Sequence, residues 1–343
     1  MSLRLLGLLL IPVVGLASLR AAEPPSARVI KFHNYDQAIE LRAGGVRAVV
    51  SPQAGGRVLE FSVDGKQALY LDEKEKEWQP GTTKPTISAG RFDYGPELTV
   101  APHPTLWSGD WTGEITGTCK AKLTSPRDEA AGVQLIREFE IVPEVLMGGV
   151  QTIGIAARLE CRQFIRNLSD KEIHVCHWGR SFSPGGGIAL VPLGDQPSRF
   201  PSKYAMYEDS AIINVRNTDE RIRERDGFLE VLGPPRKPKL GFDSFAGWLA
   251  YSMPGDLLFV KQFPTYPGHV YNEAAGLTLS IWYPAGPRIE LEPIGPRERI
   301  SPGSTTGPFV ETWWLLTFPH PKPGEQIDLA ALRTLVNQKA VRP

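Results

Sequence analysis

The stretch Arg57-Val58-Leu59-Glu60-Phe61-Ser62-Val63-Asp64-Gly65-Lys66-Gln67-Ala68-Leu69-Tyr70-Leu71 decides the fold class. Its first seven residues are rich in β-branched and aromatic side chains, which predicts a strand. The dipeptide Asp64-Gly65 then predicts a tight turn, and a second strand-like run follows at Gln67. The stretch therefore predicts antiparallel strands joined by short turns.

The same pattern recurs along most of the chain, with turns such as Pro254-Gly255 between the runs. Further strands are predicted at 28–32, 46–51, 133–142, 152–165, 172–182, 228–232, 248–253, 257–263, 277–283, 288–294 and 309–318. One segment predicts a helix, since Asp328 can cap Leu329–Ala340. Strands and helices do not alternate, so we predict an all-β fold, a large antiparallel sandwich with a short C-terminal helix.

Composition narrows the classes of function. The chain has 343 residues, and its 38 Lys and Arg residues balance 38 Asp and Glu residues. Without a basic excess there is no general footprint for nucleic acid, so no nucleic-acid partner is expected. The length fits one large β sandwich. No flexible Gly/Ser linker interrupts residues 23–343, which we therefore predict to form a single domain. We also expect the protein to be a monomer.

The first residues have the features of a secretory signal peptide. Arg4 provides a positive start, residues 5–19 form an apolar run, and Ala17, Ala21 and Ala22 offer small residues for cleavage. No second apolar run approaches the roughly 18 residues of a membrane helix. We expect residues 1–22 to be a signal peptide cleaved near residues 17–22, leaving an exported periplasmic or secreted protein without a membrane span.

An irregular segment at 71–118 is rich in proline, glycine and aromatic residues. Long loops inside compact domains are usually functional. Trp107 and Trp111 offer two aromatic faces on which a sugar could stack, with Asp110 between them as a hydrogen-bonding group. His103, held between two prolines, would face the same region. Packing within the loop is the alternative role for the two tryptophans.

Residues 158–166 and 171–182 predict two strands joined by a turn at 167–170. If these strands pair as a hairpin, Cys161 lies opposite Cys176. That register allows either a disulfide or two buried free thiols.

The same register places Glu160 opposite His177. A carboxylate beside an imidazole can transfer protons, although a simple cross-strand hydrogen bond is the alternative. His174 and His177 lie on opposite faces of the strand, so they are not expected to bind one metal ion. The chain has no nucleophile elbow, Walker loop, His-Glu-x-x-His or Cys-x-x-Cys motif, so neither a metal nor a cofactor is predicted.

A second group of polar residues lies on the strand predicted at 288–294. Glu290 and Glu292 share one face of this strand, so both point into a pocket or both into water. Pro293 indicates that the strand ends there or lies at an edge, where a carboxylate can lean over a cleft.

Several short elements occur in order along the mature chain. They are Gly55–Phe61 with Asp64-Gly65-Lys66, Arg137-Glu138-Phe139, Ile165-Arg166-Asn167, His177-Trp178, Leu291-Glu292, Pro302-Gly303-Ser304 and Glu311-x-Trp313. Together they resemble the galactose mutarotase-like superfamily, and more closely an uncharacterised branch of exported bacterial proteins. The resemblance implies a β-supersandwich whose concave sheet binds a carbohydrate.

In aldose 1-epimerases, the best-known members, a His acts as general acid at the ring oxygen and a late Glu as general base. The resemblance assigns these roles to His177 and Glu292, and Trp178 follows the histidine. From the predicted hairpin register, Glu160 is a further expected sugar contact beside Trp178. The Asn-Arg element of the family is matched only loosely, because the Asn is missing and Arg91 is the nearest basic residue. Mutarotation needs an acid and a base on opposite sides of a sugar ring, and no cofactor.

Three hypotheses follow. The first is an exported carbohydrate-binding protein that isomerises its sugar in the manner of aldose 1-epimerases. The second is a non-catalytic glycan-binding or structural envelope protein on the same scaffold. The third, a polysaccharide hydrolase or lyase using Glu290 and Glu292, is weaker, because carboxylates two residues apart on one strand do not flank a bond.

Overall fold

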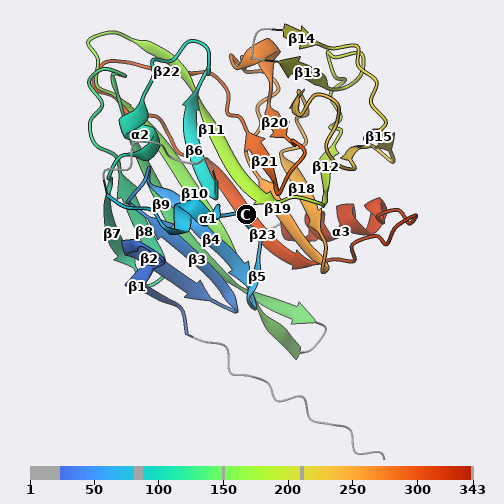
Figure 1. The fold of residues 1–343 in the computed structure, drawn as a ribbon, viewed down its shortest axis with the longest axis horizontal. Helices are drawn as coiled ribbons and strands as arrows, with labels where there is room; N and C mark the ends of the chain where they lie inside the picture. Colours follow the sequence, from blue (N-terminus) through green and yellow to red (C-terminus); the bar gives the residue numbers. More distant parts are fainter. Residues whose placement is uncertain (1–23, 81–87, 149–150, 209–211, 341–343) are drawn as a thin grey trace, which may run out of the picture.

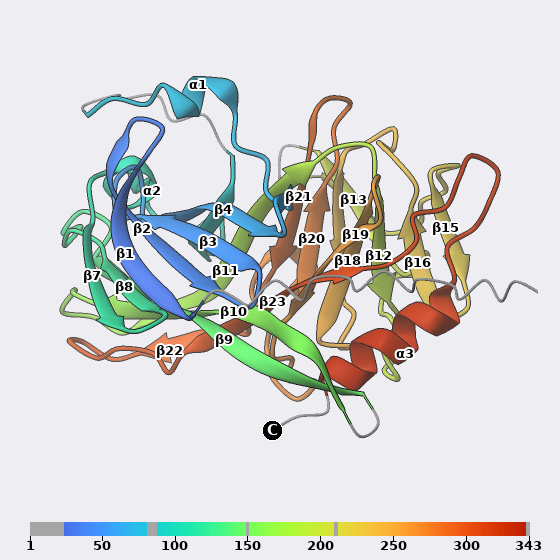
Figure 2. The ribbon, with the colours of Figure 1, turned by 90° about the horizontal axis from the view of Figure 1, so that it is seen from below.

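The computed structural model describes residues 24–80, 88–148, 151–208 and 212–340. The signal peptide predicted at residues 1–22 lies outside the described residues. Two large antiparallel sheets pack face to face, as Figures 1 and 2 show in two orientations. The all-β sandwich predicted from the strand pattern is confirmed.

The thirteen-stranded sheet has its middle at β11 (Ile173–Pro184), the strand on which the candidate site is built. Its order is β1 (Ser26–Phe32), β2 (Tyr35–Ala43), β3 (Val46–Ser51), β4 (Arg57–Val63), β6 (Gly90–Gly95), β11, β21 (Arg288–Pro293), β20 (Leu279–Trp282), β17 (Lys239–Phe242), β13 (Ala205–Glu208) and β14 (Ile212–Asn214). Two short strands join it at the side, β5 (Lys66–Gln67) on β4 and β22 (Glu298–Ile300) on β11.

The ten-stranded sheet forms the second layer. Its order is β15 (Ile222–Arg225), β16 (Phe228–Val231), β12 (Ile188–Pro192), β18 (Trp248–Met253), β19 (Leu257–Gln262), β23 (Phe309–Thr317), β10 (Gln151–Asn167), β9 (Val133–Gly148), β8 (Lys120–Thr124) and β7 (Thr112–Gly117). The helices of the described residues are α1 (Glu73–Lys76), α2 (Pro104–Ser108), the single turn η1 (Ala274–Gly276) and α3 (Leu329–Ala340).

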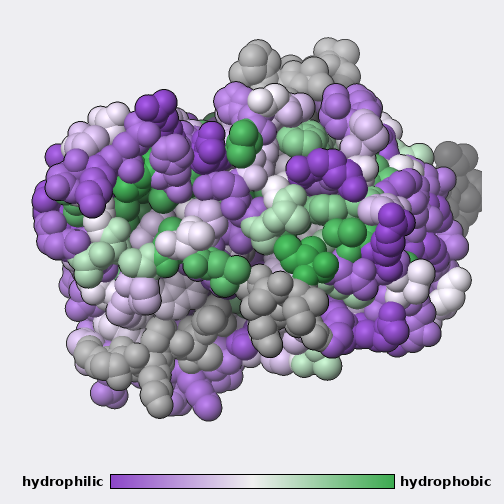
Figure 3. Space-filling model, turned by 90° about the horizontal axis from the view of Figure 1, so that it is seen from above, coloured by the Kyte–Doolittle hydropathy of each residue, from purple (hydrophilic) through white to green (hydrophobic). Residues whose placement is uncertain are grey.

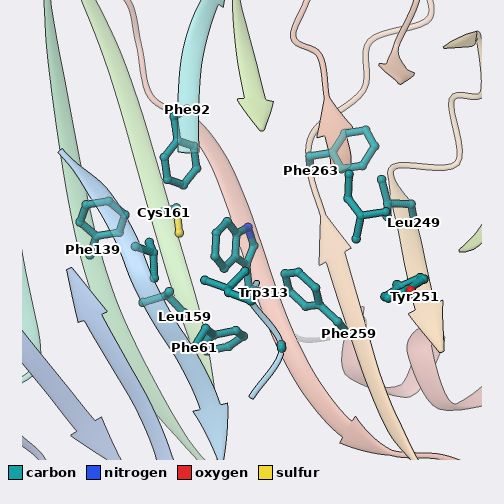
Figure 4. Packing of buried hydrophobic residues seen from close by; sticks show 14 of the residues in the cluster. Phe61, Phe92, Phe139, Leu159, Cys161, Leu249, Tyr251, Phe259, Phe263 and Trp313 are labelled. Carbon is teal, nitrogen blue, oxygen red and sulfur yellow. The ribbon is translucent and has the colours of Figure 1, made fainter. Parts of the chain in front are cut away.

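Aromatic side chains from both sheets fill the space between them (Figure 4). Trp313 of β23 stacks on Phe92 of β6, with ring centroids 5.7 Å apart. The edges of Phe61 and Phe259 meet the same indole at 5.8 and 5.5 Å. Such offset and edge-to-face contacts stabilise a core beyond the apolar area that they bury. Trp313 therefore joins the two sheets at their centre.

A charged pair is buried in the same interior. Lys261 Nζ lies 3.0 Å from Glu311 Oε2, and both side chains are fully buried. The ammonium also donates to Ser181 Oγ at 3.0 Å, while Gln163 Nε2 and Trp313 Nε1 donate to the carboxylate at 3.1 and 2.9 Å. A buried ion pair persists only when such hydrogen bonds satisfy its remaining polar atoms.

The C-terminal helix forms as predicted. The Asp328 carboxylate accepts a hydrogen bond from the Ala331 backbone N–H at 2.9 Å and so caps α3. Leu332 and Val336 are buried against the outer face of the ten-stranded sheet, where Trp314 lies. Among the described residues, no helix has both the length and the apolar character needed to cross a membrane.

The predicted hairpin of 158–166 with 171–182 is wrong. β10 pairs with β9 and β23 in one sheet, while β11 pairs with β6, β21 and β22 in the other. Asn167 explains the corner: its amide group donates to the carbonyls of Lys171 and Ile300, and its side-chain oxygen accepts from Ser169. These bonds hold the turn as a link from one sheet to the other.

The corner at Asn167 also determines where the cysteines lie. Cys161 lies in the core between the sheets, whereas Cys176 belongs to a separate cluster with Trp178. Both thiols are free and buried, as is Cys119. The disulfide alternative is therefore excluded, because the two strands carry the residues to different layers.

Candidate functional site

The side chains of β11 alternate between two environments. Trp178 and Arg180 point to the face of the thirteen-stranded sheet that is turned away from the second sheet, which we call the open face. His177 points the other way and stacks on Phe309 of β23, with ring centroids 5.5 Å apart. This alternation is the period-two geometry of a strand.

Strand register brings polar residues together on the open face. Across β6 and β11, Asp93 pairs with Trp178 and Arg91 with Arg180. Across β11 and β21, Ser181 pairs with Leu291, so Arg180 lies opposite Glu292. Directly opposed residues point to the same face of a sheet. The open face therefore collects charged residues from three adjacent strands.

Glu292 is the most enclosed of these groups. Both of its carboxylate oxygens accept hydrogen bonds from Lys239 Nζ, at 2.5 and 2.7 Å, and Oε2 also accepts from Trp178 Nε1 at 3.0 Å. Burial and the nearby charge of Glu290 raise the pKa of Glu292 to about 7, against the lowering effect of Lys239. A carboxylate with this pKa can accept a proton at neutral pH and return it.

Glu290 has the opposite character. Arg180 Nε donates to its Oε1 at 2.9 Å. Burial alone would raise the pKa of Glu290, but the charges of Arg180 and Lys239 hold it below its usual value. The two neighbouring carboxylates therefore differ in pKa. Glu290 stays ionised, while Glu292 can gain and lose a proton near neutral pH.

Trp107 of α2 lies between two guanidinium groups. The Cζ atom of Arg91 is 3.8 Å from the indole centroid, and that of Arg180 is 5.1 Å away. Arg91 Nη2 also donates to the Trp107 backbone carbonyl. Burial and the charge of Arg57 lower the pKa of Arg91. This indole is held in place beside the carboxylates by cation–π contacts.

His103, directly before α2, is fixed by two acceptors. Its Nδ1 is 2.7 Å from the Ala101 carbonyl, and its Nε2 is 2.8 Å from Asp93 Oδ1. Neither partner can donate, so both ring nitrogens carry protons and the imidazole is charged in this geometry. Burial would lower the pKa of His103, but Asp93 raises it. His103 is thus a charged imidazole on the open face whose two N–H groups are bound to protein acceptors, one of which it must release to protonate a ligand.

The donor and the base flank β11. His103 is bound to Asp93 of β6, and Glu292 belongs to β21, with β11 between the two strands. Neighbouring strands lie about 4.8 Å apart, so these two strands are separated by about 10 Å. A sugar lying across β11 would therefore have an acid on one side and a base on the other.

His177 does not join this arrangement. Its side chain is buried between the sheets, where Nε2 lies 3.3 Å from Thr306 Oγ1, and burial lowers its pKa to about 3. Because Glu292 occupies the opposite face, the structure does not bring the two residues together across one sugar ring.

The remaining predicted contacts separate into two groups. All four of the first group belong to the open face, but Trp178 and Arg91 are buried there, whereas Trp107 and His103 are half-buried. Glu160 lies on β10, where Arg158 and Arg162 hold its carboxylate. Trp111 is buried, with Nε1 donating to the Leu106 carbonyl at 3.2 Å, and Asp110 is exposed beyond it.

Three residues of the site were missed from the sequence. Asp93 lies two positions after Arg91, and Arg180 two after Trp178, so period-two spacing could have indicated both. Lys239 is carried by β17, and no local pattern indicates that it reaches Glu292. Within the described ranges, no group of three or more His, Cys, Asp or Glu side chains is arranged to hold a metal ion.

Solved structures show the same fold. The Slr1438 protein from Synechocystis sp. PCC 6803 superposes with a TM-score of 0.54 at 14% identity, covering 84% of this chain and 99% of that chain. A putative aldose 1-epimerase from Escherichia coli K12 gives a TM-score of 0.54 at 12% identity, with coverages of 82% and 99%. A galactose mutarotase-like protein from Clostridium acetobutylicum gives 0.52 at 13% identity, with coverages of 85% and 97%.

The chain thus has the galactose mutarotase-like fold. At these identities the likeness concerns the fold alone, because one scaffold supports many functions. No protein-family model matches the chain, and no curated protein matches it in sequence.

Proposed function

We propose that this protein binds a carbohydrate on the open face and interconverts its anomers by proton transfer. Glu292 acts as the general base at the anomeric hydroxyl, and His103 acts as the general acid at the ring oxygen. The observation that carries the proposal is the placement of Glu292 on β21 and of the His103–Asp93 pair at β6, on opposite sides of β11. The raised pKa of Glu292 supports its role as a base. The donor on the opposite side of β11 completes the pair that mutarotation requires.

Trp107 and Arg180 contact the sugar in this proposal, while the buried Trp178 holds Glu292 through its Nε1–H. The two indoles lie beside the Arg180 guanidinium, at 5.1 and 5.2 Å from its Cζ. An indole face packs against the apolar face of a pyranose, while a guanidinium donates to its hydroxyl groups. We also propose that the N-terminal leader directs export, so the sugar would be met outside the cytoplasm.

Non-catalytic glycan binding is the second candidate. One observation favours it: Lys239 and Trp178 hold the Glu292 carboxylate, and both ring nitrogens of His103 have protein acceptors. In that case Glu292 and His103 replace these hydrogen bonds with hydrogen bonds to hydroxyl groups of the ligand and transfer no proton. The hydrolase alternative lacks such support, since Glu290 and Glu292 lie side by side instead of flanking a bond.

Polarimetry of freshly dissolved monosaccharides tests the proposal. Wild-type protein should accelerate mutarotation of at least one common aldose, and Glu292→Gln and His103→Gln should each remove the acceleration. His174→Gln is the matched control, because His174 also pairs with a carboxylate, Glu172 at 3.0 Å, but outside the site. Acceleration that survives Glu292→Gln would reject the mechanism, and sugar binding without acceleration would favour the second candidate.

A further inference from the structure

A hollow lies in the described part of the chain outside the open-face site, and we call it the second hollow. It has a volume of about 420 Å³ and is formed by three loops, at 196–199, 243–245 and 267–271. A smaller hollow of about 130 Å³ adjoins it and shares Gln196, Pro197 and Asp243. The Val270 carbonyl accepts a hydrogen bond from the Arg297 N–H, next to β22, which places the third loop at one end of the sandwich. Figure 3 views that end and shows hydrophobic side chains in hollows between hydrophilic ones.

The polar wall of this second hollow is rigidly built. The Asp243 carboxylate is buried and accepts hydrogen bonds from Ser198 Oγ at 2.6 Å and from the Arg199 backbone N–H at 2.7 Å. Arg199 Nε lies 3.4 Å from the same carboxylate, and Nη2 donates to the Gly276 carbonyl at 2.7 Å. A guanidinium carries five N–H donors, so Arg199 keeps donors for a ligand.

The opposite wall is aromatic and apolar. Phe245 and Tyr271 meet edge to face at 5.6 Å, and the Tyr271 hydroxyl accepts from the Tyr266 N–H at 3.0 Å. His269 stacks on Tyr266 at 5.0 Å, and Val270 beside them is 55% exposed. Apolar surface facing fixed, planar hydrogen-bonding groups matches a sugar ring, which has apolar faces and polar edges.

The loop that forms this wall also borders the first site. Glu273, two residues after Tyr271, accepts from the Glu97 N–H at 2.9 Å, and the Glu97 carboxylate is 3.8 Å from Arg180 Nη1. Residues two apart along a chain have Cα atoms no more than about 7 Å apart. Glu273 and Glu97 therefore link the loop that forms this wall to Arg180 of the open-face site.

We propose that the hollow is a second sugar subsite, so that the ligand is an oligosaccharide with one unit on the open face and the next between Arg199 and Tyr271. This inference rests on the proposed function for the position of the first unit. It adds that affinity depends on a second unit and that Arg199 and Val270 recognise it.

Isothermal titration with matched sugars tests the subsite. The probes are glucose, galactose and mannose and the α- and β-linked disaccharides of each. At least one disaccharide should bind roughly tenfold more tightly than its monosaccharide, the gain expected from one further hydrogen bond to a charged group. Arg199→Ala and Val270→Ser should each reduce that gain and leave monosaccharide binding unchanged.

Two control variants match these substitutions. Arg236 resembles Arg199, since it is 73% exposed and lies 3.5 Å from the buried Asp219, while Arg199 is 60% exposed and lies 3.4 Å from the buried Asp243. Val29 is 56% exposed, as against 55% for Val270. Arg236→Ala and Val29→Ser should therefore leave both affinities unchanged.

The outcomes separate the two proposals. Equal affinity for monosaccharides and disaccharides, or a gain that survives both subsite variants, overturns the subsite and leaves the open-face site standing. A gain that Arg199→Ala removes, in a protein without mutarotase activity, supports the subsite and rejects the catalytic proposal. Absence of binding by every probe overturns both.

Discussion

Lys239 Nζ holds both carboxylate oxygens of Glu292, at 2.5 and 2.7 Å. The two residues come from different strands, β17 and β21, with β20 between them. The ammonium stabilises the charged form of a carboxylate whose pKa burial and Glu290 have raised to about 7. The contact therefore sets the pH range in which Glu292 can act as a base.

Replacing Lys239 should move that range upward. In Lys239→Met the stabilising charge is lost, so the pKa of Glu292 rises and less base is present at neutral pH. We expect the acid limb of the pH–rate profile for mutarotation to move up by about one pH unit. At pH values below the new limb, the rate should be roughly tenfold lower than that of the wild type. Lys203→Met is the control, since Lys203 forms an exposed pair with Glu224 at 2.5 Å. An unchanged acid limb would contradict the assigned role.

Replacing Glu290 should have the opposite effect. Glu290→Gln removes the negative charge that raises the pKa of Glu292, so that pKa falls. The acid limb of the same profile should then move to lower pH, while the plateau rate stays within a few fold. If the acid limb instead moved to higher pH, as expected for Lys239→Met, the charge of Glu290 would not raise the pKa of Glu292.

His177 should affect stability and not activity. Burial lowers its pKa to about 3, whereas the ordinary value is 6.5. Between these values only the unfolded chain binds the proton, so the contribution of His177 to stability falls as the pH drops from about 6.5 toward 3. Urea unfolding at pH 7.5 and 4.5 should show that His177→Phe removes roughly 2–3 kcal/mol of the stability lost on acidification. The mutarotation rate at pH 7.5 should not change.

The buried pair of Lys261 and Glu311 predicts strong coupling. Lys261→Met leaves the Glu311 carboxylate without its cation and should cost about 3–5 kcal/mol in the free energy of unfolding. Adding Glu311→Gln removes the unpaired charge but keeps an acceptor for Trp313, so the double variant should regain most of the loss. A double-mutant cycle by denaturant unfolding measures this coupling, and simple additivity would contradict it.

Sequence patterns predicted the strands best where apolar residues are dense. The strands at 46–51, 57–63 and 248–253 and the helix at 329–340 have the bounds that local pattern and capping indicate. By contrast, β6 is six residues long and begins and ends in glycine, so it was hidden in a segment expected to be irregular. That strand carries two residues of the site.

The candidate site was predictable only in part. Glu292 and Trp178 could be identified by their place on strands, but the face of His177 could not. Its orientation depends on the Asn167 corner, where side-chain hydrogen bonds to the carbonyls of Lys171 and Ile300 direct the chain into the other sheet. Asn167 and Ile300 are more than one hundred positions apart in the sequence. A contact of this kind produces no periodic pattern along the chain from which it could be predicted.

The position of β11 determines when the open face can be completed during synthesis. One neighbour, β6, precedes it, but the other, β21, begins at Arg288, more than one hundred residues after β11 starts at Ile173. No N-terminal fragment that stops before residue 288 can contain the complete open face. Pairing between such distant strands is slow, so the open face is expected to form only after β21 has emerged.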